Sequence, residues 1–414
     1  MSRCVVVGAG AREHALAQTL ASRHDVVVTP GNAGIAAQGI ACSAAGATEL
    51  DADLFVIGPE QPLVDGLADT LRAQGKSVLG PGVDGARLEG SKAYMKEFLN
   101  AAGVPTAAYG SFSDETRALE FLATMSAPYV IKTDGLAAGK GVLVTNDLDE
   151  ARADVLDKLR GSSFGAAGST VVIEEGLAGE ECSLLFLCDG TRATPLVAAQ
   201  DFKRVGDGDR GANTGGMGAY APMAAMDSRA VTEITATMVE PTMRELRRRG
   251  IDFRGVLYAG LMLTKDGPRL LEYNVRFGDP ETEVLAPLYG DRLYELLERA
   301  ANGDLRGVDT TTSGCAVTVV LAAHGYPQHP RAGDVISGLG PDGQLAHALE
   351  GVSIFHAGTR HGEHGDFMTA GGRVVAVTGV AHSVALARRR AYEGVSLVTF
   401  EGQVARTDIA AAAL

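Results

Sequence analysis

Short apolar runs alternate with helix-like segments over the first hundred residues, and this alternation restricts the possible folds more than any other feature of the sequence. Apolar runs of strand length occur at four places: Cys4–Val7, Val26–Val28, Leu54–Ile57 and Val78–Leu79. Helical patterns separate them, among them Gln61–Gln74. Strands that alternate with helices are typical of a parallel, doubly wound sheet. We therefore predict an N-terminal α/β domain that ends at Gly103, after a last helix at Ser91–Ala102.

The pattern changes after this first domain. Two strand-like segments, Tyr129–Lys132 and Gly141–Val144, are joined by a glycine-rich turn, and strands joined by tight turns favour antiparallel pairing. A long helix interrupted at Pro241 is predicted over Ser228–Arg249. The residues Lys265-Asp266-Gly267 between two apolar runs predict a hairpin. Toward the end of the chain, further strand patterns and one helix predict a small closing domain.

The composition excludes several classes of protein. With 37 Lys and Arg against 51 Asp and Glu, the net charge is −14, which argues against nucleic acid or an anionic membrane as a partner. Five widely spread cysteines without a C-x-x-C pair indicate reduced thiols in the cytoplasm rather than disulfides or a zinc site. The first apolar run is too short for a signal peptide, and the longest, around Cys315–Ala323, is below membrane-spanning length. The 53 glycines among 414 residues indicate tight turns and close backbone approach to ligands.

A glycine turn, Gly8-Ala9-Gly10, follows the first predicted strand. The segment resembles the dinucleotide fingerprint, but Glu13 stands where the third glycine is needed and no ribose-binding acid follows Val28. A nicotinamide site is therefore disfavoured. The free N–H groups of the helix that starts here can still hold a phosphate. A turn needed only for packing is the alternative.

A second glycine-rich loop lies between two lysines, in the segment KTDGLAAGKG of residues 132–141. It is not a Walker A loop, because Asp134 stands where that motif needs its first glycine and Gly141 where it needs Ser or Thr. A glycine hairpin flanked by lysines can close over a polyphosphate, whose charge the lysines and backbone N–H groups would balance. A hairpin with surface lysines is the alternative.

Polar side chains follow one face of a later predicted strand. Glu272, Asn274 and Arg276 alternate with apolar residues, so the three share a face. A carboxylate, an amide oxygen and a guanidinium in one row suit a complex of Mg²⁺ and phosphate, because Mg²⁺ takes few protein oxygens and completes its shell with water and phosphate. An exposed strand face is the alternative.

Three further segments carry weaker signals. The acidic turn IEEGLAGEE, residues 173–181, can offer backbone groups to adenine and carboxylates to ribose, although such turns are usually solvated loops. The segment GDGDRGANTGGMG, residues 206–218, is a long glycine loop that is either disordered or ordered on substrate. The histidines around His361 and His364 indicate a polar loop rather than a metal site.

These motifs together resemble the glycinamide ribonucleotide synthetase family of the ATP-grasp superfamily. The resemblance extends nearly from end to end, in the segments GAREHAL, PGNAG, GPEQPLVDG, LEGSKAYMKEF, IKTDGLAAGKGV, QDFKRVGDGDRGANTGGMGAY, LYAGLM, LEYNVRFGDPETE and FHAGT. The family usually has glycine where Ala11 stands and proline where Ala212 stands, and both differences are small. The resemblance implies a mixed α/β and α+β multidomain chain: an N-terminal substrate-binding domain with a doubly wound parallel sheet (1–103), an ATP-grasp core (104–122 and 191–312), an ATP-grasp lid subdomain (123–190) and a small C-terminal α+β domain (313–414).

The resemblance also implies an activity. ATP, 5-phosphoribosylamine and glycine would give glycinamide ribonucleotide, ADP and phosphate through a glycyl phosphate, as a step of purine biosynthesis in the cytoplasm, carried out by a monomer. No protein nucleophile is needed, so catalysis would rest on positioning and charge neutralisation. Another carboxylate–amine ligase of the superfamily is the alternative, and a nucleotide-binding regulatory module without turnover is a third reading.

By the same resemblance, the expected site residues fall into groups. Those for ATP are Lys92, Lys132, Gly135, Gly139, Lys140, Gly141, Glu174, Glu175, Leu177, Glu180 and Glu181. Those for phosphoribosylamine are Gly10, Arg12, Glu13, Asn32 and Glu60. Glu272 and Asn274 would bind Mg²⁺ (or Mn²⁺), and Arg276 would act in catalysis by stabilising the transferring phosphoryl group. The strand Leu257–Leu263 carries no acid where many relatives supply another metal ligand, so the number of metal ions stays open.

Overall fold

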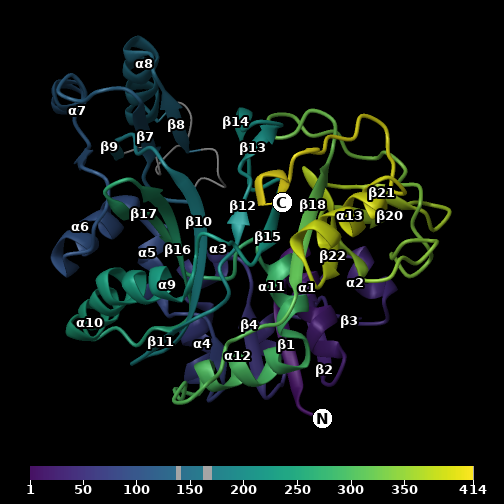
Figure 1. Cartoon of the computed structure of the whole chain (residues 1–414). Helices are drawn as coiled ribbons and strands as arrows, with labels where there is room; N and C mark the ends of the chain where they lie inside the picture. Colours follow the sequence, from purple (N-terminus) through teal and green to yellow (C-terminus); the bar gives the residue numbers. More distant parts are fainter. Residues whose placement is uncertain (137–140, 162–169, 414) are drawn as a thin grey trace.

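The N-terminal part of the chain forms the predicted parallel sheet. The structure, a computed structural model, describes residues 1–136, 141–161 and 170–413 (Figure 1). Five parallel strands lie in the order β3-β2-β1-β4-β5; they are β1 (Arg3–Gly8), β2 (Asp25–Pro30), β3 (Ala41–Cys42), β4 (Leu54–Ile57) and β5 (Val78–Leu79). The accompanying helices are α1 (Ala11–Ala21), α2 (Ala33–Ala37), α3 (Glu60–Val64), α4 (Leu67–Ala73), α5 (Val83–Gly90) and α6 (Lys92–Ala102). Val5 and Val7 pack into one core cluster and Cys4 and Val6 into another, so both faces of the sheet are buried and its strands are apolar throughout.

Two predicted helices are interrupted in the structure. The single helix expected at Gln61–Gln74 is wrong, because Gly66 between α3 and α4 adopts a φ of +86°, which is the left-handed region that favours glycine. The interruption expected near Pro241 is confirmed: α9 (Ser228–Ile234) and α10 (Glu240–Arg248) are separated by a π-helical segment, Thr235–Val239. Proline has no N–H to donate to the preceding turn, so the regular α-helical bonding stops there.

A small antiparallel sheet forms the unit at the upper left of Figure 1. Its strands lie in the order β6-β9-β7-β8: β6 (Tyr109–Phe112), β9 (Val171–Glu175), β7 (Tyr129–Thr133) and β8 (Val142–Thr145). The helices α7 (Glu115–Leu122) and α8 (Leu148–Leu159) share a core with this sheet, to which Ala118, Val155 and Ile173 belong. The antiparallel pairing predicted for β7 and β8 is confirmed.

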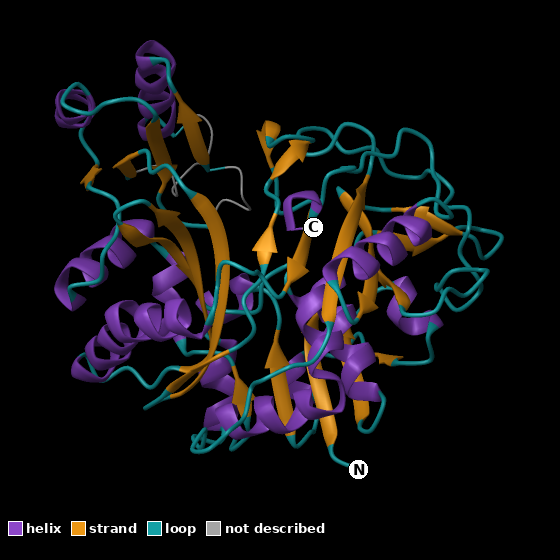
Figure 2. Cartoon of the chain, viewed as in Figure 1, coloured by secondary structure: helices purple, strands orange, loops and turns teal. Residues whose placement is uncertain are grey.

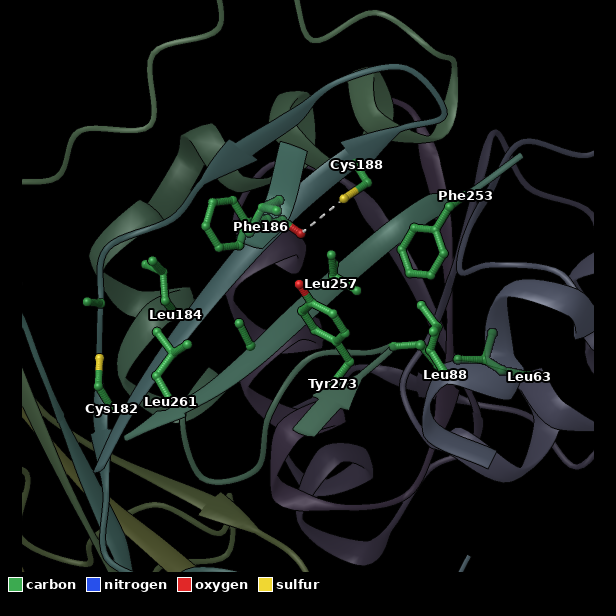
Figure 3. Packing of buried hydrophobic residues seen from close by; sticks show 14 of the residues in the cluster. Leu63, Leu88, Cys182, Leu184, Phe186, Cys188, Phe253, Leu257, Leu261 and Tyr273 are labelled. Carbon is green, nitrogen blue, oxygen red and sulfur yellow. Dashed lines mark hydrogen bonds between the residues drawn. The ribbon is translucent and has the colours of Figure 1, made fainter. Parts of the chain in front are cut away.

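The central sheet separates an apolar core from the side that carries the polar residues of β17. Its order is β11-β10-β16-β17, with β11 (Ala193–Pro195), β10 (Glu180–Asp189), β16 (Arg254–Thr264) and β17 (Gly267–Asn274). The predicted hairpin joins β16 and β17. Figure 3 shows Tyr273 of β17 beside Leu257 of β16, with Phe253 and, from the N-terminal helices, Leu63 and Leu88 in the same cluster. Because side chains alternate along a strand, the neighbours of Tyr273, Glu272 and Asn274, point to the other side.

The sheet at the C-terminal end takes strands from two distant parts of the sequence. Its order is β12-β15-β18-β22-β19, with β12 (Gln200–Asp201), β15 (Gly218–Ala221), β18 (Cys315–Ala322), β22 (Arg373–Ala381) and β19 (Val352–His356). Figure 2 shows the strands of the chain in orange and its helices in purple. A Cβ on Gly218 would lie 2.6 Å from the carbonyl oxygen of Thr318, so glycine is needed where β15 joins β18. Further α-helices and strands are α11 (Thr282–Tyr289), α12 (Leu293–Ala301), β13 (Arg204–Gly206), β14 (Arg210–Asn213), β20 (Thr359–His361), β21 (Phe367–Thr369) and α13 (Val384–Val395).

Two buried histidines join helix α1 to strand β19. His14 and His356 are fully buried, and the backbone N–H of His356 donates to Nδ1 of His14 over 2.9 Å. Burial, together with the neighbouring His356, lowers the pKa of His14 to about 3, and burial lowers the pKa of His356 to about 4. Both imidazoles are therefore neutral in the folded chain at neutral pH.

Acidification should weaken this contact. The unfolded chain protonates these imidazoles near pH 6.5, whereas the folded chain does so only near their lowered pKa values, so stability is lost as the pH falls below about 6.5. At about pH 5 the loss is about 2 kcal/mol for each histidine. Between about pH 7 and about pH 5, the free energy of unfolding should fall by about 2 kcal/mol more in the wild type than in His14→Gln, measured by urea titration. An equal fall in both proteins would contradict the neutral state of His14.

Candidate active site

A cavity of about 1030 Å³ is lined by residues from the N-terminal domain, the small antiparallel sheet, the central sheet and the C-terminal sheet. Glu60 lines it from the N-terminal domain, Lys132 from the small antiparallel sheet, Glu272 from the central sheet and Arg373 from the C-terminal sheet. Sites for single ligands usually measure roughly 300–1,000 Å³, so this cavity can hold more than one small molecule.

Most of the predicted site residues line this cavity. They are Gly10, Arg12, Glu13, Glu60, Lys92, Lys132, Gly141, Glu174, Glu175, Leu177, Glu180, Glu181, Glu272, Asn274 and Arg276. Asn32 and Gly135 do not line it. Gly139 and Lys140 lie outside the described residues.

The polar face of β17 points into the cavity, as the alternation of its residues predicts. Glu272, Asn274 and the following Arg276 line the cavity and are half-buried, whereas Tyr273 and Val275 between them are buried. Nη2 of Arg276 donates to the amide oxygen of Asn274 over 3.3 Å. The expected row of carboxylate, amide and guanidinium is therefore present at the cavity wall.

Cations surround Glu272. Burial raises the pKa of this carboxyl, but Lys203, Lys132, Lys92 and Arg276 outweigh burial and hold the pKa below its ordinary value. The carboxylate is thus ionised at neutral pH. Cations that gather around one ionised carboxylate create a positive field suited to a polyphosphate.

The donor set on β17 fits Mg²⁺ bound together with phosphate. Within residues 1–136, 141–161 and 170–413, no three His, Cys, Asp or Glu side chains gather into a metal cage. Mg²⁺ does not need one, because it keeps several waters and takes oxygens from bound phosphates. Glu272 supplies an ionised oxygen and Asn274 a neutral one, both at the cavity wall. The two residues suit an ion that arrives with a nucleotide.

Arg276 is held by two carboxylates from the N-terminal domain. Its Nη2 lies 2.8 Å from Oε1 of Glu89, and its Nε lies 3.3 Å from Oε2 of Glu60. Glu89 also accepts the backbone N–H of Val275 over 2.8 Å. These contacts fix the guanidinium between the N-terminal domain and the central sheet, where it faces the cavity from the end of β17.

Two lysines bind opposite oxygens of Glu174. Nζ of Lys96 lies 2.9 Å from Oε2, and Nζ of Lys132 lies 2.9 Å from Oε1. All three side chains are buried, and Lys96 also donates to the hydroxyl of Thr106 over 2.8 Å. Burial, only partly offset by Glu174, lowers the pKa of Lys96 to about 8. The carboxylate of Glu174 is therefore engaged by lysines, and Lys132 is fixed at the cavity wall.

The sequence analysis assigns no role to Lys96, although its position in α6 indicates that it is buried and needs a partner. It stands four residues after Lys92, next to the buried Met95 on the apolar side of α6. A lysine on the buried side of an amphipathic helix requires a partner, but the partner, Glu174, is 78 residues away.

The carboxylates of Glu175, Glu180 and Glu181 line the cavity, and each has a different partner within the fold. Oε1 of Glu175 accepts the backbone N–H of Ala108 over 2.9 Å, so this carboxylate is partly used within the fold. Oε1 of Glu180 accepts from the side chain of Gln200 over 3.1 Å. Oε2 of Glu181 lies 3.3 Å from Nζ of Lys203, a cavity-lining lysine that sequence reasoning left unassigned.

Lys92, the first residue of α6, contacts Gly135 at the start of the glycine loop. Nζ of Lys92 donates to the carbonyl oxygen of Gly135 over 3.2 Å, and Gly135 adopts a φ of +85°. The carboxylate of Asp134 accepts the hydroxyl of Ser91 and the N–H of Ala93 at the start of α6. Asp134 and Gly135 are thus attached to the helix that carries Lys92, a residue that lines the cavity.

The glycine turn of the N-terminal domain encloses a carboxylate. Oε2 of Glu13 accepts the N–H of Gly10 over 2.6 Å, and Oε1 accepts from Nε of Arg12 over 2.6 Å. A Cβ on Gly58 would lie 1.9 Å from this carboxylate, and one on Gly8 would lie 2.6 Å from it. The N–H of Gly10 therefore already has an anionic acceptor, and the close approach of Glu13 accounts for the glycines around it.

Asn32 lies at the contact between the N-terminal and C-terminal domains. Its amide nitrogen donates to the carbonyl oxygens of Ala9 and His356, over 2.9 and 2.7 Å, and its amide oxygen accepts the N–H of Ile35 at the start of α2. All these bonds are internal to the fold, so the side chain does not reach the cavity.

Two further acids of the cavity have no role assigned from the sequence: Glu281, which is buried, and Asp279, which is half-buried. Oε1 of Glu281 accepts from the hydroxyls of Tyr258 and Ser183 over 2.5 and 2.8 Å. Oδ1 of Asp279 lies 3.0 Å from Nη1 of Arg373. The available signal is the segment GDPETE directly after Arg276, which places both acids beside the polar face of β17.

Comparison with known proteins gives a consistent result over nearly the whole chain. The family models for phosphoribosylglycinamide synthetase match in order: the N domain at residues 2–89, the ATP-grasp (A) domain at 90–282 and the C domain at 316–412. A phosphoribosylamine–glycine ligase of Brucella melitensis is 45% identical over 420 residues, which cover 98% of this chain and 97% of the relative.

Solved structures show the same likeness. The crystal structure of phosphoribosylamine–glycine ligase from Thermotoga maritima has a TM-score of 0.87 at 35% identity, over 98% of this chain and 100% of that one. The biotin carboxylase domain of 2-oxoglutarate carboxylase from Hydrogenobacter thermophilus, crystallised with MgADP, ADP and bicarbonate, has a TM-score of 0.74 at 15% identity, over 98% of this chain and 91% of that one. This second likeness is one of fold alone.

Proposed function

The chain belongs to the phosphoribosylglycinamide synthetase family, and on that premise we propose how its own residues divide the work of the ligase reaction. It is an ATP-dependent ligase of purine biosynthesis that joins glycine to 5-phosphoribosylamine. The observation that carries the proposal is the face of β17, where Glu272, Asn274 and Arg276 line the same cavity as Lys132.

ATP is proposed to lie between the small antiparallel sheet and β17. Lys92 and Lys132 would contact its phosphates, and the loop of residues 135–141 would close over them. Leu177 and the backbone near Glu175 would contact adenine, with Glu180 or Glu181 on the ribose. For Glu174 we propose a positioning role instead, because both its oxygens are engaged by lysines.

Phosphoribosylamine is proposed to bind on the N-terminal side, near Gly10, Arg12 and Glu60, which line the cavity there. Glu13 and Asn32 would position the backbone around this part of the cavity and would not contact the substrate, since their polar atoms bond within the fold.

The chemistry requires two displacements. A carboxylate oxygen of glycine attacks the γ-phosphorus of ATP, the bond to the bridging oxygen breaks, and ADP leaves. The amine of phosphoribosylamine then attacks the carbonyl carbon of glycyl phosphate, loses a proton, and phosphate leaves. Arg276 is proposed to hold the phosphoryl group during the first displacement by neutralising its charge, as in phosphoryl transfer generally.

ATP-grasp enzymes use ATP with Mg²⁺, and we propose Glu272 and Asn274 as the metal ligands of this chain. A bound Mg²⁺ would neutralise phosphate charge and orient the γ-phosphoryl group. The two residues would hold it against the wall from which Arg276 and Lys132 also reach the phosphates.

We further propose a cytoplasmic monomer that binds small molecules and neither nucleic acid nor membranes. The net charge of −14 supports the exclusion of polyanionic partners. In the part of the chain that the structure describes, no helix has both the length and the apolar character needed to cross a bilayer.

The direct test is the glycine dependence of ADP release. With phosphoribosylamine generated in place and Mg²⁺ present, ADP should form only when glycine is added, in a ratio of one ADP to one glycinamide ribonucleotide. Alanine and β-alanine in place of glycine, and other amines in place of phosphoribosylamine, serve as controls. Equal rates with another acid would favour a different carboxylate–amine ligase, and nucleotide binding without turnover would favour a regulatory module.

A further inference from the structure

The hairpin of β13 and β14 lines the cavity but belongs to no larger sheet. The two strands form a sheet of their own. The hairpin includes residues 206–213 of the glycine-rich segment 206–218, for which the sequence leaves open disorder or ordering on substrate. Arg204, Asp209 and Asn213 of this hairpin line the cavity. A two-stranded hairpin is marginally stable by itself, so its position depends on what holds its turn.

The end of the chain holds this turn. The N–H and hydroxyl of Thr407 donate to the two carboxylate oxygens of Asp207, over 2.8 and 2.5 Å. In the opposite direction, the N–H of Gly208 donates to Oδ2 of Asp408 over 2.8 Å. Bonds therefore run both ways between residues 207–208 and residues 407–408.

Arg406 is the centre of this contact. Its side chain is 1% exposed and forms a two-bonded ion pair with Asp408, with both distances 2.7 Å. Nη1 also donates to Oδ1 of Asp209 over 2.7 Å and to the carbonyl oxygen of Arg204 over 3.2 Å, and the guanidinium lies 4.9 Å from the ring centre of Phe202. A buried guanidinium requires such partners.

Asp209 shows why the hairpin needs an external support. Its φ is +55°, in the left-handed region that residues other than glycine rarely adopt. A cavity-lining residue in this conformation is held by its surroundings, and the carboxylate of Asp209 bonds to Arg406.

The segment that holds the hairpin is itself fixed on helix α13. The guanidinium of Arg388 donates to the carbonyl oxygens of Thr407 and Ile409, over 2.7 and 2.8 Å. The hydroxyl of Tyr392 donates to the carbonyl oxygen of Arg406 over 3.0 Å. Bonds thus connect a helix of the C-terminal domain, through residues 406–408, to the cavity wall.

We propose that residues 406–408 form a clasp that positions the β13–β14 hairpin for the ligase reaction, with Arg406 as a positioning residue. The inference rests on the proposed function for its activity readout. The C-terminal segment would thus affect catalysis without lining the cavity, because it positions a hairpin that does line it.

The test compares Arg406→Met with Arg390→Met in the full-length chain. Arg390 also lies in the C-terminal domain, where it donates to the carbonyl oxygen of Val380 and pairs with Glu350, so its substitution removes a guanidinium with a carbonyl bond and an ion pair away from the hairpin. Trypsin cleaves after Arg204 and Arg210, and cleavage there reports how often the hairpin opens. We expect Arg406→Met to raise the rate of cleavage at these sites about tenfold and to lower kcat/KM about tenfold to a hundredfold, whereas Arg390→Met changes neither.

Asp207→Ala removes the hairpin carboxylate that accepts two bonds from Thr407 of the clasp. It should reproduce both effects, and its combination with Arg406→Met should be less than additive. The proposal is overturned if trypsin cleaves Arg406→Met at the wild-type rate. It is also overturned if both arginine variants lose activity in proportion to a shared fall in thermal midpoint. Trypsin cleavage is independent of catalysis. A wild type without glycine-dependent turnover would therefore refute the proposed function and leave the cleavage comparison to decide on the clasp.

Discussion

Replacement of Glu272 with glutamine is expected to lower glycine-dependent ADP formation by about a hundredfold to a thousandfold. Glutamine has nearly the same shape, so the backbone pairing of β17 with β16 at Gly260 should be kept. The substitution removes the ionised oxygen around which Lys203, Lys132 and Lys92 gather. Without it, nothing on this stretch of β17 offers an anionic ligand to Mg²⁺.

The measurement is ADP release at increasing Mg²⁺ concentration, with circular dichroism as a check on the fold. Glu272→Gln should need more Mg²⁺ for half-maximal rate as well as reaching a lower rate. Asp266→Asn is the matched control, because Asp266 is an exposed acid in the turn of the same hairpin. Turnover of Glu272→Gln within about twofold of the wild type would remove the metal assignment, since a lost ligand should cost far more.

Those parts of the fold that depend on local pattern could be predicted from the sequence. The parallel sheet, the β16–β17 hairpin and the polar face of β17 all follow from alternation over a few residues. The split between α3 and α4 could not be predicted with the same rules, because it depends on the left-handed conformation of Gly66. The pairing of β15 with β18 is also beyond local reasoning, since nearly a hundred residues separate the two strands along the chain.

The site divides in the same way. Glu272 and Asn274 were found because side-chain alternation places them on one face, whereas Lys96 acquires its role from a partner on a different element. Glu174 and Asn32 illustrate the reverse case. Resemblance indicates ligand contacts for both, and the structure places their polar groups in bonds within the fold. Sequence position shows that such a residue matters for the site, but only packing shows whether it faces the ligand or supports a neighbour that does.

Replacement of Glu174 with glutamine is expected to be the most destabilising single change at the site. It leaves Lys96 and Lys132, both buried, without the carboxylate that lies 2.9 Å from each. Removal of one member of a buried ion pair costs about 3–5 kcal/mol of folding stability. Urea unfolding should show this loss, and the KM for ATP should rise because Lys132 is no longer held at the cavity wall.

A second variant separates stability from ATP binding. In Glu174→Leu combined with Lys96→Met, one buried lysine and the carboxylate are replaced by apolar side chains of similar size, and such replacements often restore stability. The double variant should therefore recover part of the unfolding free energy lost by Glu174→Gln, since Lys96 no longer leaves a buried charge unpaired while Lys132 still does. Its KM for ATP should stay raised, because Lys132 still lacks the oxygen that positions it. If the double variant instead bound ATP as tightly as the wild type, the carboxylate of Glu174 would contribute to stability alone. The position of Lys132 at the cavity wall would then be set by strand β7, to which it belongs.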